Sequence, residues 1–515
     1  MPASRFSPKP ESFRPSGGTS HGPPKTPGVP SLFPVIVVAI AAALVSAACS
    51  MTPELAMPRA PVPAELTGSR GASLAPASME LPGEDESVLE FFNDERLAEL
   101  VKRVFAGNRD IRLALLKISE ARELAGIAGA ERLPMVGAEG KATFTGGSSM
   151  PLERSSSLEL MVPSFQIDLF GKLKEMESAA FEEYLGSLES FRAAKIALIA
   201  GVAELHFETR LLSEKELLIR NTLKAYRDSF AFVENNIING RSSLLDLEEA
   251  RARVELAEVM LLDNQILKTR AENALKLLAG DFGDIEASLP PPKKLKDAEP
   301  KDIVREPVSS EALLKRPDIL EAEHALRAAN HETGAAKAAF FPSIDLTGTV
   351  GFMSSGLSAL VLGGDDSWNF GPALTLPLFS GGKLKASERL AEIRREKAVV
   401  NYEKAVQTAF REVSDILGTM DDLKARLAAR EKYLATQRRV LDLAFERYGN
   451  GGISYLEVLD AQRNVYAAEE DVLDLRKDYL SAHASLFSAL GGGADAPEPV
   501  LPDIPLAPKE FGENP

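Results

Sequence analysis

The sequence predicts a mainly α-helical chain in which one unit, a β-strand hairpin that carries a very long helical hairpin, occurs twice. Three observations predict this fold class. Sequence motifs recur at a nearly constant spacing, which indicates a duplicated domain. Each copy contains a long stretch without proline, residues 172–238 and 383–448, which favours long helices. Between these helices apolar and polar residues alternate, as they do in β-strands.

Composition argues against several classes of function. The chain has 515 residues, of which 45% are hydrophobic, and lacks the repeated runs of roughly 20 apolar residues that a bundle of transmembrane helices needs. Its net charge of −16 gives no basic face, so we expect no nucleic-acid partner. The sequence has no phosphate loop, no catalytic Ser/His/Asp set and no metal-ligand spacing, which predicts neither an enzyme nor a bound cofactor. His324 and His331 are expected as ordinary helix-surface residues.

The N-terminus predicts export and a lipid anchor. A basic start precedes a short apolar stretch, residues 32–45, and then the small residues 46–48 ahead of Cys49, the only cysteine. This order is typical of a signal peptide, residues 1–48, whose removal leaves Cys49 as an acylated N-terminus. A plain signal peptide, or an uncleaved anchor with an incidental cysteine, is the alternative. Residues 49–92 are then expected to form an extended, lipid-anchored segment.

The duplication sets the domain boundaries. Its early part has an offset of 208 residues, as from Asn108 to Arg316, and its later part an offset of 211, as from Gly171 to Gly382. We therefore expect repeats at residues 93–287 and 310–492, a linker at 288–309 and a proline-rich disordered tail at 493–515. The aligned stretches are 108–111 with 316–319, 126–134 with 334–342, 171–174 with 382–385, and 239–246 with 450–457.

Each repeat is expected to begin with a helix, followed by two strands. The helices are predicted at about 94–132 and 310–339. Strands are predicted around Phe144, at 158–169, at 344–352 and at 368–378. Such alternation fits a transmembrane strand or a half-buried strand of a soluble sheet. Four strands cannot close a barrel, so strands in a membrane would require an oligomer.

Trp368 has two possible environments. It opens the last predicted strand beside two aspartates. It is either an aromatic residue at a membrane interface or a loop-edge residue that packs on a soluble core.

The long helices are expected to turn at sharply marked tips. At about 1.5 Å per residue each descending helix would be roughly 100 Å long. An Asn-Gly pair ends each of these helices, because glycine can adopt the left-handed conformation. A serine then begins the return helix as its N-cap, with an acidic residue at the capping-box position. These residues are Asn239, Gly240, Ser243 and Asp246 in the first copy, and Asn450, Gly451, Ser454 and Glu457 in the second.

Several short stretches spread over residues 91–490 carry a resemblance to a known family. They are Phe91–Asp94, Phe165–Lys172, Lys315–Ile319, Ala339–Pro342, Pro377–Gly382, Glu446–Gly451 and Leu459–Arg463. With these stretches in this order, the chain resembles the outer-membrane efflux proteins of the TolC/OprM type. It is most similar to their lipid-anchored, NodT-like branch, which serves resistance-nodulation-division pumps.

The resemblance implies an assembly and a function. Three copies would form a twelve-stranded barrel in the outer-membrane lipid and a twelve-helix tunnel that extends into the periplasm. The homotrimer would be the exit duct of a tripartite efflux pump. Its partners would be an inner-membrane resistance-nodulation-division pump and a periplasmic adaptor, the membrane fusion protein. The adaptor would contact the tips at Asn239, Gly240, Asn450 and Gly451.

The resemblance also implies a gate at the periplasmic end of the tunnel. The matching residues are Tyr448, Glu457 and Asp460, and Ile453 stands where some relatives carry a latch arginine. Each residue also has a structural explanation. Tyr448 could pack in a helical seam, and Glu457 could serve only the capping box. Acidic residues in a first helical turn also complement the helix dipole.

A different function stays open from the residues alone. A lipid-anchored coiled-coil rod, acting as a structural or adaptor protein without a pore, would explain the long helices and Cys49. It would not explain alternating strands in both copies.

Overall fold

The computed structural model describes residues 51–58, 62, 88–89, 91–238, 242–283, 289–298, 300, 313–355 and 365–492. The predicted signal peptide, Cys49, Asn239 and Gly240 lie outside these ranges, as do half of the linker and all of the tail. The expected domain boundaries therefore stay predictions at both ends of the chain.

The first predicted helix is in fact two helices. Helix α3 spans Glu95–Gly107 and α4 spans Arg109–Ala130, so the expectation of one helix over 94–132 is wrong. Asn108 causes the break, because its backbone is extended and its side chain accepts a hydrogen bond from the Ile111 N–H at 2.9 Å. The counterpart α8, Pro317–Ala338, begins later than predicted, with Pro317 in the first turn, where proline is favoured.

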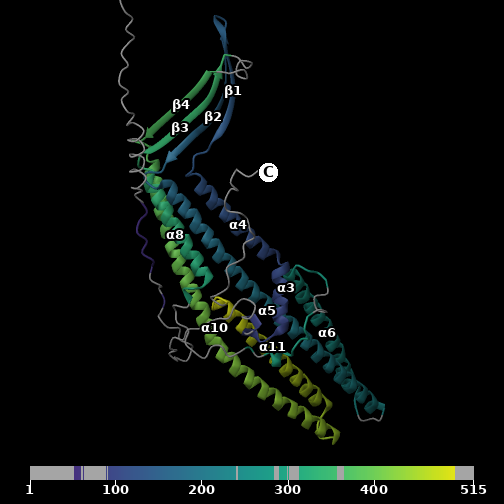
Figure 1. Ribbon diagram of the computed structural model, residues 1–515. Coiled ribbons are helices and arrows are strands. Elements are labelled where there is room, and N and C mark those ends of the chain that lie inside the picture. Colours follow the sequence, from purple (N-terminus) through teal and green to yellow (C-terminus); the bar gives the residue numbers. More distant parts are fainter. Residues whose placement is uncertain are drawn as a thin grey trace, which may run out of the picture. The chain divides into compact units, whose positions relative to one another are not determined.

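The four strands form one antiparallel sheet. Strands β1 (Gly137–Gly147), β2 (Met150–Ile167), β3 (Ser343–Ser354) and β4 (Asp365–Thr375) lie in the order β1-β2-β3-β4 (Figure 1). Strand β4 ends at Thr375 and not at 378 as expected, since Pro377 has no N–H to donate to a ladder. The central β2–β3 pair joins the two repeats.

One face of the sheet is apolar and uncovered. Leu160 lies opposite Val350, and Val350 lies opposite Trp368. These side chains are 55%, 59% and 77% exposed. Thr349 alternates with Val350 and belongs to the opposite, more polar face. Trp368 therefore lies within a strand and does not pack on a soluble core.

The long helical hairpins are confirmed. Helix α5 (Lys172–Ile238) and helix α10 (Lys383–Gly449) each have 67 residues. They pack along the return helices α6 (Leu244–Ala279) and α11 (Tyr455–Ala489), and α11 also packs against α5. Helix α8 lies between α5 and α10, and α4 lies along α5 (Figure 1).

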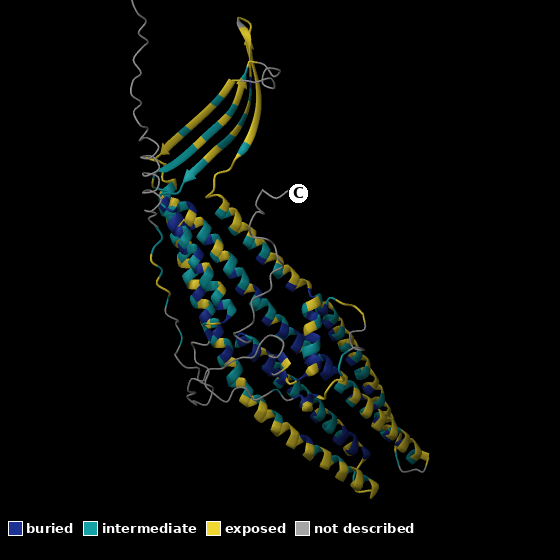
Figure 2. Cartoon of the chain, in the orientation of Figure 1, coloured by how far each residue is buried: buried dark blue, intermediate teal, exposed yellow. Residues whose placement is uncertain are grey.

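Buried residues gather where the helices meet (Figure 2). The largest cluster includes the phenylalanines 91, 92, 207 and 487 and joins α3, α5 and α11, together with the short 3-10 helix η2, Leu295–Asp297. None of the described helices combines the length and the apolar character that a membrane crossing requires.

Candidate functional site

The tip of the second hairpin is formed as the sequence predicts. The N–H of Gly451, which has a φ of 72°, donates to the Tyr448 carbonyl at 2.9 Å, and the Gly452 N–H donates to the Arg447 carbonyl at 2.9 Å. Asn450 and Gly451 thus stop α10 and turn the chain toward α11. This places Tyr448, Glu457 and Asp460 near one end of the hairpin.

The two predicted capping boxes have different outcomes. Ser243 and Asp246 form the box, with the Ser243 N–H donating to the Asp246 carboxylate at 2.8 Å. The prediction of a capping box at Ser454 and Glu457 is wrong, because the Ser454 side chain makes no capping hydrogen bond. Helix α11 is started instead by packing, since the buried Tyr455 joins the hydrophobic cluster between the hairpins. Glu457 is left as an exposed carboxylate.

Tyr448 lies in the seam between the two hairpins. Its ring is 5.2 Å from the Tyr455 ring and 6.0 Å from the Phe232 ring, measured between centroids. Its hydroxyl accepts a long hydrogen bond from the Asn236 amide at 3.5 Å. In a single chain Tyr448 therefore holds the end of α10 against α5 and α11.

Asp460 joins α11 to α6. A carboxylate oxygen of Asp460 is 4.0 Å from an Arg253 guanidinium nitrogen and 3.4 Å from one of Arg463. The carboxylate is 44% exposed, so water screens both contacts. Arg463, three residues on, could have been anticipated from helical spacing. Arg253 could not, because its approach depends on how the two hairpins pack.

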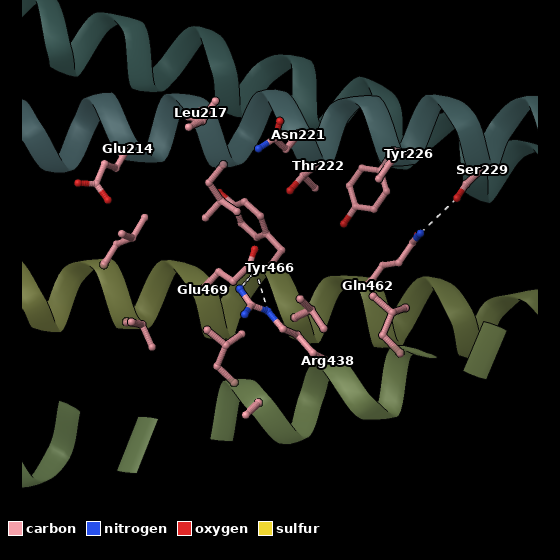
Figure 3. Close-up of a pocket in the computed structure, with 18 of the residues that line it drawn as sticks. Glu214, Leu217, Asn221, Thr222, Tyr226, Ser229, Arg438, Gln462, Tyr466 and Glu469 are labelled. Atoms are coloured by element: carbon pink, nitrogen blue, oxygen red, sulfur yellow. Dashed lines mark hydrogen bonds and ion pairs between the residues drawn. The ribbon is translucent and has the colours of Figure 1, made fainter. Parts of the chain in front are cut away.

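A groove of about 1160 Å³ separates α5 from α10 along α11 (Figure 3). Gln462 donates to the Ser229 hydroxyl at 3.2 Å, and Arg438 is paired with Glu469 at 2.6 Å. Burial raises the pKa of the Tyr466 phenol, which therefore stays protonated at neutral pH. The groove is thus lined by hydroxyl groups, paired charges and apolar side chains.

A buried polar cluster was missed at the sequence level. The Asp94 carboxylate accepts hydrogen bonds from the N–H groups of Arg96 and Leu97 at 3.0 and 3.2 Å, which caps α3. Its other oxygen lies 3.1 Å from both His206 and Arg210 on α5. Asp94 closes the Phe91–Asp94 stretch of the resemblance and precedes Glu95 as an N-cap would, but neither signal indicates His206 or Arg210 as its partners. The cluster fixes α3 to α5.

His324 and His331 are also more than surface residues. Their Nδ1 atoms lie 2.7 Å from Glu182 and 2.6 Å from Glu175 on α5, so they connect two helices. The expectation of ordinary surface histidines is wrong, because α8 packs closely along α5. Within the described ranges, no three His, Cys, Asp or Glu side chains gather as metal ligands would.

The sequence matches known proteins over most of the chain. Residues 100–281 and 308–492 match the outer membrane efflux protein family. The chain is 38% identical to the probable outer membrane lipoprotein SilC of Salmonella typhimurium over 468 residues, covering 90% of this chain and 99% of that protein. It is 36% identical to the cation efflux system protein CusC of Escherichia coli K12, covering 90% of this chain and 100% of that protein.

Solved structures show the same fold. The crystal structure of CusC superimposes with a TM-score of 0.79 at 37% identity, covering 86% of this chain and 100% of that one. The open state of the MtrE outer membrane channel of Neisseria gonorrhoeae gives 0.79 at 32% identity, covering 87% and 99%. The mainly α fold with one strand hairpin per repeat is thus the fold of known channels. The chain belongs to the outer membrane efflux protein family and is the outer-membrane channel of an efflux pump.

Proposed function

We propose that three copies of the chain form one duct, with a twelve-stranded barrel in the outer membrane and a tunnel of twelve long helices below it. The exposed apolar face of the sheet carries this proposal. Strands β1 and β4 are the edges of the sheet, and unpaired edges are not tolerated in lipid. Pairing β4 of one copy with β1 of the next removes every edge. The apolar face then meets lipid and the polar face meets water.

Two neighbouring substitutions test the orientation of the sheet. Val350→Arg puts a charge on the proposed lipid face, where it costs about 2–4 kcal/mol near the membrane centre. Thr349→Arg puts the same charge on the proposed water face. We expect Val350→Arg to lower the amount of trimer in the outer-membrane fraction much more than Thr349→Arg. An equal loss in both variants, or a greater loss in Thr349→Arg, would contradict the assignment.

The tunnel end is the proposed gate. Tyr448 closes the seam between the hairpins, and Glu457 and Asp460 share one helix face, being three residues apart. Around a three-fold axis each carboxylate would form a ring of three, which favours cations. Arg253 takes the place of a latch at position 453, since it reaches from α6 to Asp460 on α11, whereas Arg463 contacts Asp460 within α11. Loosening the contact between Arg253 and Asp460 would let the hairpins separate.

The lipid anchor is proposed at Cys49. Residues that follow it are held on α8: the Asn330 amide donates to the Pro53 carbonyl at 2.9 Å. A Cβ on Gly334 would lie 2.9 Å from the Thr52 Cα, so glycine allows this close approach. Gly334 is nine residues before β3, at most about 20 Å along the chain. Thr52 and Pro53, which follow the proposed anchor in the sequence, thus lie close to where the strands begin. We expect a palmitate analogue to label the wild-type protein and not the Cys49→Ser variant. Labelling of the variant would overturn the assignment.

The helical tips are the proposed contacts for a periplasmic adaptor, and through it for an inner-membrane pump. Ile238, Leu244 and Leu245 lie beside the first tip and are strongly exposed. A group of exposed apolar side chains is typical of a surface that contacts another protein. Leu456 adds an exposed apolar side chain at the second tip. Asn450 and Gly451 shape the second tip, and Asn239 and Gly240 are the corresponding pair in the sequence of the first. The duct itself would act without catalysis.

Cargo chemistry is proposed to be set mainly by the pump. Similarly related channels serve different systems: CusC is named for cation efflux, and TtgC of Pseudomonas putida, at 35% identity, for toluene efflux. The duct would add only a preference for cations at the gate.

A further inference from the structure

The tail that follows the second repeat has a regular pattern. Proline recurs at every third position, at residues 499, 502, 505 and 508. A polyproline II helix has three residues per turn, so these four prolines would lie along one of its faces. Leu501 and Ile504 would lie along the face beside it. The family match ends at residue 492 and does not include this pattern.

The chain turns as it leaves α11. Gly491 and Gly492 have φ angles of 84° and 59°, and the Gly492 N–H donates to the Phe487 carbonyl at 2.9 Å. This bond closes the helix with a left-handed turn. A Cβ on Gly492 would lie 2.6 Å from the Ile196 Cγ1 on α5, so only glycine fits there. The tail therefore starts against α5 and away from the axis of α11.

The groove between α5 and α10 begins within reach of this turn. Glu214 is the first residue of α5 that lines it. Ile196 and Glu214 are about five helical turns, or about 27 Å, apart, and therefore lie on one face of α5. The stretch from Gly492 to Pro499 would cover about 22 Å as a polyproline II helix. The proline pattern therefore starts near the beginning of the groove.

The length and the lining of the groove suit such a helix. Its wall on α5, from Glu214 to Phe232, is about 27 Å long. The stretch from Pro499 to Pro508 would be about 28 Å long. Grooves lined by aromatic side chains bind polyproline II segments, because the rings pack against the prolines. The aromatic side chains of this groove are Tyr226, Phe232, Phe445, Tyr455 and Tyr466 (Figure 3).

Several groups in the groove are left without a partner. Leu217, Phe232 and Phe445 are 57%, 49% and 45% exposed. Gln462 is only 8% exposed, and its Oε1 atom has no hydrogen-bond partner among the residues that the structure describes. The backbone of a polyproline II helix makes no internal hydrogen bonds, so its N–H groups are free to donate. A docked tail would thus cover the apolar side chains and supply a donor for Gln462.

Charge favours the acidic start of the tail at the near end of the groove. Lys294 and Lys296 line this end, because the N–H of the residue between them donates to the Glu214 carboxylate at 2.6 Å. Both lysines are exposed and form no ion pair with any described residue. Asp495 and Glu498 precede the proline pattern and would pass these lysines on the way into the groove.

We propose that residues 499–508 dock as a polyproline II helix in the groove of their own chain, running from Glu214 toward Phe232 with the prolines against the aromatic side chains. A segment without a fold of its own can become ordered on such a surface. The tether raises the local concentration of the tail, so weak contacts suffice. Because the groove separates α5 from α10, the docked tail would contact both helices and oppose their separation. That consequence rests on the proposed gate, whereas the docking does not.

The test is cross-linking of the full-length protein in mild detergent with a short bifunctional maleimide. At about 3.1 Å per residue the tail would bring Asp503 beside Leu217. Leu217→Cys/Asp503→Cys is therefore expected to give a product of monomer mass in which mass spectrometry finds the two positions linked. Lys224→Cys/Asp503→Cys is the matched control, because Lys224 is exposed on α5 about 10 Å farther along but does not line the groove. A tail that is not docked would link both pairs alike.

A second comparison depends on the prolines. Replacing all four by alanine in Leu217→Cys/Asp503→Cys should lower the yield of the linked product several-fold, because alanine does not hold the polyproline II conformation. The wild type, which has Cys49 alone, gives the background.

Each contrary outcome has a clear meaning. Equal yields from the Leu217→Cys and Lys224→Cys pairs, or from the two tails, would overturn the docking. Products of dimer or trimer mass would also overturn it, because the tail would then enter the groove of another chain. Particles that are not three-fold would overturn the proposed function and leave a cross-link within one chain unchanged. Leu217 is exposed, so its replacement does not put the fold at risk.

Discussion

Asp94 shows how one buried residue holds two elements together. It is 1% exposed, caps α3, and contacts His206 and Arg210 of α5. We expect Asp94→Ala to lower the free energy of unfolding by about 3–5 kcal/mol, since it removes the cap and leaves Arg210 buried without its partner. Chemical unfolding monitored by circular dichroism measures this. A loss below 1 kcal/mol, the size of a surface effect, would contradict the role.

The same residue makes stability depend on pH. Burial alone would raise the pKa of Asp94, but the hydrogen bond and charge of His206 outweigh it and lower the pKa from 3.8 to about 2. A carboxyl whose pKa is lowered by folding stabilises the protein above its unfolded pKa. About 2 kcal/mol is therefore lost as the pH falls from about 4 toward 2.

Asp94→Asn is the control for this pH dependence. It keeps a capping oxygen but cannot titrate. We expect its melting temperature to fall less between pH 4 and pH 2 than that of the wild type. Parallel curves would show that Asp94 is not the titrating group.

The gate residues give a second prediction. Neutralising Glu457 and Asp460 by Glu457→Gln and Asp460→Asn should lower the cation preference of single channels in planar bilayers several-fold, because each change removes a ring of three carboxylates. The first hairpin supplies the control: Glu249 is the counterpart of Asp460 but does not belong to the proposed gate. If Glu249→Gln lowers the cation preference as much as Asp460→Asn, the selectivity does not arise at the gate.

At the scale of single elements, the two return helices begin differently. Ser243→Ala breaks a complete capping box and should cost about 1 kcal/mol, whereas Ser454→Ala should cost almost nothing because Ser454 makes no capping bond. Hydrogen exchange in the first turn of α6 should accelerate about five-fold in the first variant. The first turn of α11 should not change in the second. Equal acceleration would contradict the difference in capping.

The sequence predicted element types better than element boundaries. The long helices were predictable to within a residue because proline is absent inside them and an Asn-Gly pair follows each of them in the sequence. The break between α3 and α4 was overlooked, although a glycine followed by an asparagine, Gly107 and Asn108, favours a helix end and a new cap. The capping box at Ser454 failed for a different reason. Its spacing is correct, but the packing of Tyr455 determines the local conformation.

At the scale of the whole molecule, the duplication made the helical hairpins predictable, but it did not indicate which side chains contact one another between the helices. The order of the elements and the lengths of the long helices follow from the sequence, because equivalent motifs mark these elements. The order of the strands in the sheet does not. The contact of Asp460 with Arg253, and the His–Glu pairs between α5 and α8, join residues that are far apart in the chain. No local pattern indicates these contacts. They depend on the packing of long helices, which sequence periodicity describes only as apolar stripes.

The assembly is the central claim, and one measurement tests it most directly. Full-length protein purified in mild detergent and imaged by negative stain should give three-fold particles with a central channel and a helical part about 100 Å long. Such particles would confirm that four-stranded sheets and helical hairpins from three chains close into one duct. Single rods, monomers or dimers would contradict it, because four strands cannot enclose a pore.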